Sequence, residues 1–83
     1  MADDRTEAAP SAGDLRTARK EAARLERRLE RLGAEEERLH AELAAAATNH
    51  TRVLELDSRL RELLAEKDRV ETEWLTAAEI AER

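Results

Sequence analysis

Basic side chains are concentrated in one stretch of this chain. Residues 16–31 carry seven basic residues against three acidic ones, a local charge of +4 in a chain whose total charge is −5. Together with one later arginine, the basic residues are Arg16, Arg19, Lys20, Arg24, Arg27, Arg28, Arg31 and Arg38. Guanidinium and ammonium groups bind the phosphates of a nucleic-acid backbone without reading the bases. We therefore predict that these eight residues contact nucleic acid, either DNA or RNA.

The same residues have a simpler interpretation. A run of charges on a helix is usually a solvated face, and an acidic total charge opposes non-specific binding to nucleic acid. The chain has one aromatic residue, Trp74, so it lacks the aromatic side chains on which bases stack. Any contact with nucleic acid is therefore expected to be electrostatic and not sequence-specific.

Residues that perform catalysis or bind metals are few. The sequence has no cysteine and no glycine-rich phosphate loop, and its two histidines, His40 and His50, fall on separate elements. The carboxylates are spread over helical faces, with no pocket that would perturb their pKa values. We expect a protein with no catalytic residue, no metal and no cofactor.

Two stripes of apolar residues must position these side chains. The first consists of Leu15, Ala18, Ala22, Leu25, Leu29, Leu32, Leu39, Leu43 and Ala46, interrupted only at Glu36, and the second of Val53, Leu56, Leu60, Leu63, Lys67, Val70, Trp74, Ala77 and Ala81. Steps of three and four residues are typical of one side of a coiled-coil helix. A charged fraction of 42% and a single proline are also typical of long helices.

The two stripes match when the chain folds back on itself. Leu43 then lies opposite Leu56, and Leu25 lies opposite Trp74. In every such pair the two residue numbers add up to 99, as an antiparallel arrangement requires. We predict an all-α fold, an antiparallel two-helix coiled-coil hairpin.

The hairpin is expected to occupy residues 15–83, with helices at 15–47 and 52–82 and a turn at 48–51. Residues 1–14 are expected to be a disordered tail or linker. Asp14 is expected to cap the first helix, Asn49 to end it in a left-handed conformation, and Thr51 to cap the second. Gly33 is expected to mark the least regular part of the first helix.

Two stripe positions are charged and lie in adjacent layers. Glu36 faces Leu63 and Lys67 faces Leu32, so their side chains either extend out to solvent or meet in a partly buried ion pair. Beside the stripes, the same alignment predicts three attractive pairs and two repulsive ones. These are Glu42 with Arg59, Arg28 with Glu73 and His40 with Asp57, and Glu35 with Glu66 and Glu26 with Glu71.

The segments RTARKEAARLERRLERL (16–32), EEERLHAEL (35–43) and LDSRLRELLAEKDRVETEWLTAAE (56–79), with the late Trp74, resemble a known domain. They are similar to the C-terminal coiled-coil domain of ABC-F ATPases of the Uup type, over about 65 residues. The resemblance implies a cytoplasmic parent protein with two ATP-binding cassettes, linked to ribosomes and translation, whose hairpin contacts DNA or ribosomal RNA. This chain lacks the Walker and signature motifs, so the hairpin itself would not bind ATP.

Two alternatives remain open. The hairpin can be a structural module that docks on a protein or self-associates, with Leu54, Leu64, Leu75 and Ile80 as the second contact surface. It also shares its architecture with the tRNA-binding arm of seryl-tRNA synthetases. No apolar run approaches the roughly 18 residues of a membrane span, so membrane contact is not expected.

Overall fold

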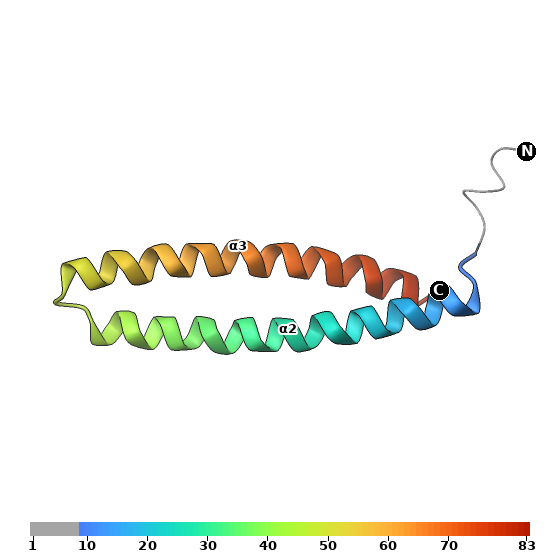
Figure 1. Cartoon of the computed structure of the whole chain (residues 1–83), viewed down its shortest axis with the longest axis horizontal. Helices are drawn as coiled ribbons and strands as arrows, with labels where there is room; N and C mark the ends of the chain where they lie inside the picture. Colours follow the sequence, from blue (N-terminus) through green and yellow to red (C-terminus); the bar gives the residue numbers. More distant parts are fainter. Residues whose placement is uncertain (1–8) are drawn as a thin grey trace, which may run out of the picture.

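The computed structural model describes residues 9–83, which form two long helices. Helix α2 spans Ala12–Ala45 and helix α3 spans His50–Ala81. The helices run antiparallel and lie side by side along their whole length, joined by a short turn (Figure 1). The predicted all-α helical hairpin is therefore confirmed. Residues 1–8, which make up most of the expected tail, lie outside the described residues.

Helix α2 begins three residues earlier than expected because Ser11 caps it, not Asp14. The Ser11 Oγ accepts a hydrogen bond from the Asp14 backbone N–H at 3.1 Å, and the Asp14 carboxylate accepts one from the Ser11 N–H at 3.2 Å. This reciprocal pair is a capping box, which satisfies two backbone N–H groups at once. The prediction that residues 12–14 belong to the linker was therefore wrong.

The turn is also shifted, to residues 46–49. Asn49 has φ −106° and is not a left-handed terminator of α2; it is the N-cap of α3, where its side chain accepts a hydrogen bond from the Arg52 N–H at 3.1 Å. Thr51, the expected cap, lies within α3. Asparagine is among the best N-cap residues, so its side chain, one turn before Val53, starts the helix. No non-glycine residue among 9–83 has a positive φ.

The core is the predicted seam. The buried residues all belong to the two stripes: Ala18, Leu25, Leu32, Leu39, Leu56, Leu60, Leu63, Val70 and Ala77. Five further stripe residues pack against them and are only partly buried: Ala22, Leu29, Leu43, Ala46 and Trp74. Because only two helices are present, each edge of the seam meets solvent, and this leaves part of each stripe exposed.

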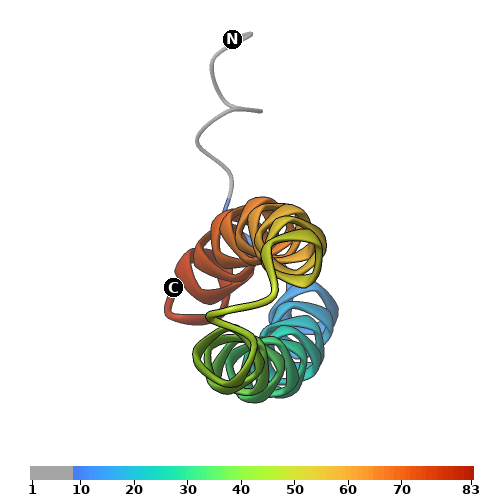
Figure 2. The same cartoon turned by 90° about the vertical axis from the view of Figure 1, so that its left-hand side faces the viewer.

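The end-on view shows how the two helices are arranged around a common axis. The two helices wrap around each other with a left-handed sense (Figure 2). A seven-residue apolar repeat is slightly shorter than two turns of a straight helix, so the helices must supercoil to keep the stripes in contact. Helix α2 runs without interruption through Gly33.

Within residues 9–83, neither helix has a stretch that is both long and apolar enough to cross a membrane.

Candidate nucleic-acid interface

The outward face of α2 carries most of the basic residues. In the heptad defined by the stripe, positions c and f, two of the three that point away from α3, hold five basic side chains and, from Thr17 to Ala45, no acidic one; the third, position b, holds Glu30 and Glu37. We call this surface the basic ridge; it consists of Lys20, Arg24, Arg27, Arg31 and Arg38, and all five are exposed. At about 1.5 Å per residue, the ridge extends over about 27 Å of the helix.

Ion pairs divide the eight predicted residues into two groups. Arg24 is paired with Glu21 on the same helix at 2.6 Å, and Arg28 is paired with Glu66 of α3. The bond from Arg24 lowers the pKa of the Glu21 carboxyl. Within residues 9–83 no ion pair involves the other six, Arg16, Arg19, Lys20, Arg27, Arg31 and Arg38. Their cations are exposed to solvent and are available to an anionic ligand.

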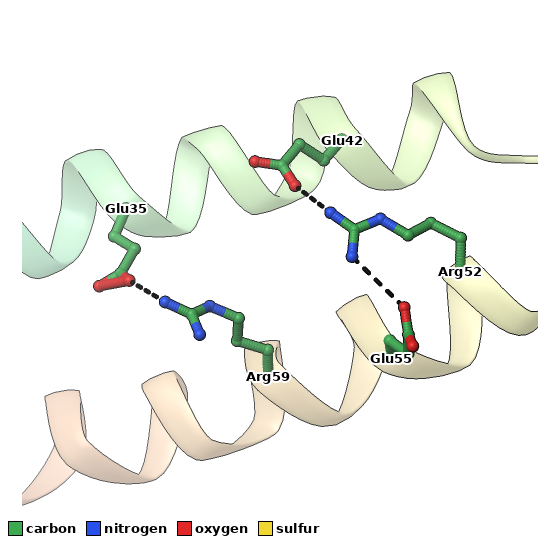
Figure 3. Close-up of polar contacts among 5 residues, drawn as sticks. All are labelled: Glu35, Glu42, Arg52, Glu55 and Arg59. Atoms are coloured by element: carbon green, nitrogen blue, oxygen red, sulfur yellow. Dashed lines mark hydrogen bonds and ion pairs between the residues drawn. The ribbon is translucent and has the colours of Figure 1, made fainter.

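Arg28 belongs instead to a ladder of ion pairs along one edge of the seam. Its other members are Glu35 with Arg59 and Glu42 with Arg52, each at 3.2 Å (Figure 3). Successive members are seven residues apart on both helices, so the ladder follows the heptad. Arg52 also pairs with Glu55 of its own helix, at 3.4 Å. Its guanidinium therefore binds one carboxylate from each helix (Figure 3).

The observed ion pairs of the ladder are shifted by one heptad from the predicted flanking pairs. Glu42 was matched with Arg59, Arg28 with Glu73, and Glu35 with Glu66. The arginines Arg52 and Arg59 extend along the seam away from the turn and reach the glutamate one heptad further on (Figure 3). The predicted Glu35–Glu66 repulsion is thereby replaced by two attractive pairs.

On the opposite edge, the predicted pair of His40 with Asp57 is wrong. His40 lies 3.6 Å from Glu36 on its own helix, and Asp57 pairs with Arg61 at 2.5 Å. Glu26 accepts a hydrogen bond from the indole N–H of Trp74 at 3.1 Å, and it lines the same groove as Glu71, its predicted neighbour.

The charged residues of the seam form an ion pair. The Lys67 Nζ donates to the Glu36 Oε1 at 2.9 Å, and the side chains retain 32% and 24% of their exposure. This hydrogen bond lowers the pKa of Glu36 and raises the pKa of Lys67. Of the two readings of the sequence, pairing across the seam is the one the structure adopts.

Trp74 lies at the edge of the seam. Its ring packs against the core that contains Leu25, as predicted, but it is only partly buried. Trp74 helps to line a groove whose other lining residues are Glu26, Leu29, Glu30, Glu71 and Leu75. We call the apolar side chains Leu29, Trp74 and Leu75 the floor of this groove and the three carboxylates its rim.

The described part of the chain contains no cluster of side chains suited to binding a metal ion. Glu37 and His40 have the spacing of a Glu-x-x-His metal motif, but residues 9–83 contain no group of three potential ligands that could hold an ion. His50 is exposed at the first position of α3, at the turn.

Comparisons with known proteins identify no family for this chain. No protein-family model, no curated protein and no solved structure matches the chain.

Proposed function

We propose that the hairpin is a non-catalytic binding module that contacts the phosphate backbone of DNA or structured RNA through the basic ridge. The observation that carries the proposal is the absence of any acidic residue at the c and f heptad positions of α2 between Thr17 and Ala45. Glutamate occurs at the neighbouring b, e and g positions of this helix, so this strip of one sign differs from an ordinary solvated face, on which both signs alternate. A stiff rod with cations on one side follows a polyanion without needing a pocket.

The distribution of charge also orients the ligand. Helix α3 carries eight acidic and five basic residues between His50 and Ala81, whereas residues 16–31 of α2 have a charge of +4. A nucleic acid is therefore attracted to the α2 side, at the half of the rod nearer the chain ends, and is repelled from α3.

The test compares two charge reversals of equal size. In the first variant Arg24, Arg27 and Arg31 of the ridge become Glu; in the second Arg61, Arg69 and Arg83, which lie outside the ridge, become Glu. Both variants change the net charge by −6, so a difference between them reports position and not total charge. We expect the ridge variant to lose at least ten-fold in affinity for labelled duplex DNA at low salt, and the control variant to lose clearly less. Equal losses would contradict the proposal.

We further propose that the parent protein is an ABC-F ATPase in the cytoplasm, with the hairpin as an accessory arm beside its cassettes. The sequence resemblance over residues 16–79 supports this, and its basic beginning and late Trp74 are its distinguishing features. Cassette motifs encoded directly before residue 1 would support the assignment. A synthetase core encoded after residue 83 would instead favour the tRNA-binding arm.

Docking on another protein is a second candidate function. Three leucines of α3 lie outside the seam and are exposed: Leu54 by 57%, Leu64 by 41% and Leu75 by 55%. Exposed leucines on one helix are a common basis for contact with a further helix.

A further inference from the structure

We propose that the acidic groove beside Trp74 binds the basic ridge of a second copy of this chain. The groove consists of Leu29, Trp74 and Leu75 as its floor and Glu26, Glu30 and Glu71 as its rim. The proposal concerns self-association and does not depend on the binding of nucleic acid.

Charge is the first argument for this occupant. The rim of the groove contains carboxylates alone, and the ridge contains cations alone. Among the described residues no ion pair involves Glu30 or Glu71, and none involves Arg27 or Arg31. Lys67, one turn before Glu71, is already bonded to Glu36. Each surface therefore offers the charges that the other lacks.

The chemistry of the floor is the second argument. Arginine combines a flat cation with an aliphatic stem, which covers apolar surface while the charged end reaches the rim. A guanidinium also stacks on an indole ring, and Trp74 is the one aromatic residue of the chain. Arg24, Arg27 and Arg31 succeed one another at steps of three and four on one helical face, so neighbouring arginines can reach Trp74 and the rim together.

The arrangement is head-to-tail, because ridge and groove are different surfaces. On α2 they lie on neighbouring faces, and no ridge residue of the described chain forms an ion pair with a groove carboxylate of the same molecule. A pair keeps one free groove on one copy and one free ridge on the other, so association continues into longer assemblies as concentration rises. The same contact occupies the surface that would bind phosphate, so a polyanion would compete with it.

The test uses two variants that each lose one surface. The ridge variant carries Arg24, Arg27 and Arg31 changed to Glu, and the groove variant carries Glu26, Glu30 and Glu71 changed to Lys. All of these side chains are exposed, so circular dichroism should show unchanged helicity in both. Analytical ultracentrifugation at about 10 mM ionic strength, where the Debye length is about 30 Å, then measures association without any nucleic acid.

We expect the wild-type chain to show a mass that rises with concentration and falls again in high salt, and each variant alone to be monomeric. An equimolar mixture of the two variants should form a one-to-one complex, because one retains only the ridge and the other only the groove. Trp74 emission should change on mixing when Trp74 of the groove variant is replaced by Phe, so that the signal comes from the intact groove. A monomeric wild type, or a mixture that fails to associate, would overturn the proposal.

A third variant tests for association through the exposed leucines. Leu54→Ala and Leu64→Ala together leave the acidic groove intact. We expect this variant to associate as the wild type does. If it becomes monomeric while the groove variant still associates, the contact lies on the leucines and the proposal is wrong.

Discussion

Replacing Leu25 by Ala is the most informative change in the seam. Leu25 is 1% exposed and is the most completely buried side chain of the described residues. The change removes about three carbon atoms, at about 0.8 kcal/mol for each buried methylene, or about 2.4 kcal/mol. A cavity adds to this loss, although two helices can move together and fill part of it, so we expect a total of about 2–4 kcal/mol.

This loss is large for a protein of this size. Stabilities of about 0.05–0.15 kcal/mol per residue give a hairpin of some 70 residues only about 4–10 kcal/mol in total. The Leu25→Ala chain should therefore unfold at a much lower urea concentration, as followed by circular dichroism. The slope of the transition should remain unchanged, because the surface exposed on unfolding is nearly the same.

Leu54→Ala is the matched control. Leu54 lies on α3, outside the seam, and is 57% exposed, so its truncation should change the free energy of unfolding by no more than about 0.5 kcal/mol. Equal effects of the two substitutions would refute the assignment of the seam. A fall in slope for Leu25→Ala would mean that unfolding is no longer two-state.

Four further changes test individual features of the hairpin by thermal or urea unfolding. Gly33→Ala should stabilise by up to about 1 kcal/mol, because α2 is regular there and an added Cβ meets no atom within 4 Å; a loss would mean that the glycine is required. Asn49→Ala should cost about 1 kcal/mol by removing the α3 cap, and no loss would contradict that role. Trp74→Ala should cost about 2 kcal/mol, less than the 3–5 kcal/mol of a fully buried aromatic residue, and a null effect would place the indole on the surface. The stabilisation from Glu36 and Lys67 should be complete between about pH 4.3 and 10.4, the unfolded pKa values. In the folded state the pKa of Glu36 is lowered and the pKa of Lys67 is raised. The stabilisation should therefore disappear as the pH falls through the folded-state pKa of Glu36 or rises through the folded-state pKa of Lys67. The difference in melting temperature between wild type and Glu36→Gln should thus be present at pH 7 and absent at pH 2, and equal differences at both would refute the pair.

The seam could be predicted from sequence because it depends on a period alone. Leu25, Leu39, Leu56 and Val70 are buried because residues three and four apart share one helical face, whatever surrounds them. The outward direction of the ridge follows from the same period, so the exposure of Arg27 and its neighbours was predictable as well.

Details that depend on a particular side-chain conformation were not predictable in the same way. Arginine has several rotatable bonds, so Arg59 reaches Glu35 and Arg28 reaches Glu66, each a full heptad away from the glutamate expected for it. The start of α2 was missed for another reason. Ser11 and Asp14 have the spacing of a capping box, but the apolar stripe begins only at Leu15, and the residue directly before it, Asp14, is itself a good cap.

The groove beside Trp74 could not be inferred from the stripe. The heptad places Trp74 at a seam position, where a tryptophan is normally buried. In the structure Trp74 is only partly buried, its indole N–H donates to Glu26, and its side chain helps to line the groove. Only the three-dimensional arrangement brings Glu30 of α2 and Glu71 of α3 to the same groove.

Salt dependence of binding tests the central claim most directly. The affinity of the chain for labelled duplex DNA should be measured by fluorescence anisotropy over a salt series, for the wild type and for the Arg24/Arg27/Arg31→Glu variant. About five phosphate contacts along the ridge predict a slope of log K against log salt of roughly −3 to −5 for the wild type, and binding too weak to measure for the variant. The absence of wild-type binding at low salt, or an equal slope in the variant, would contradict the assignment of the basic ridge as a phosphate-binding surface.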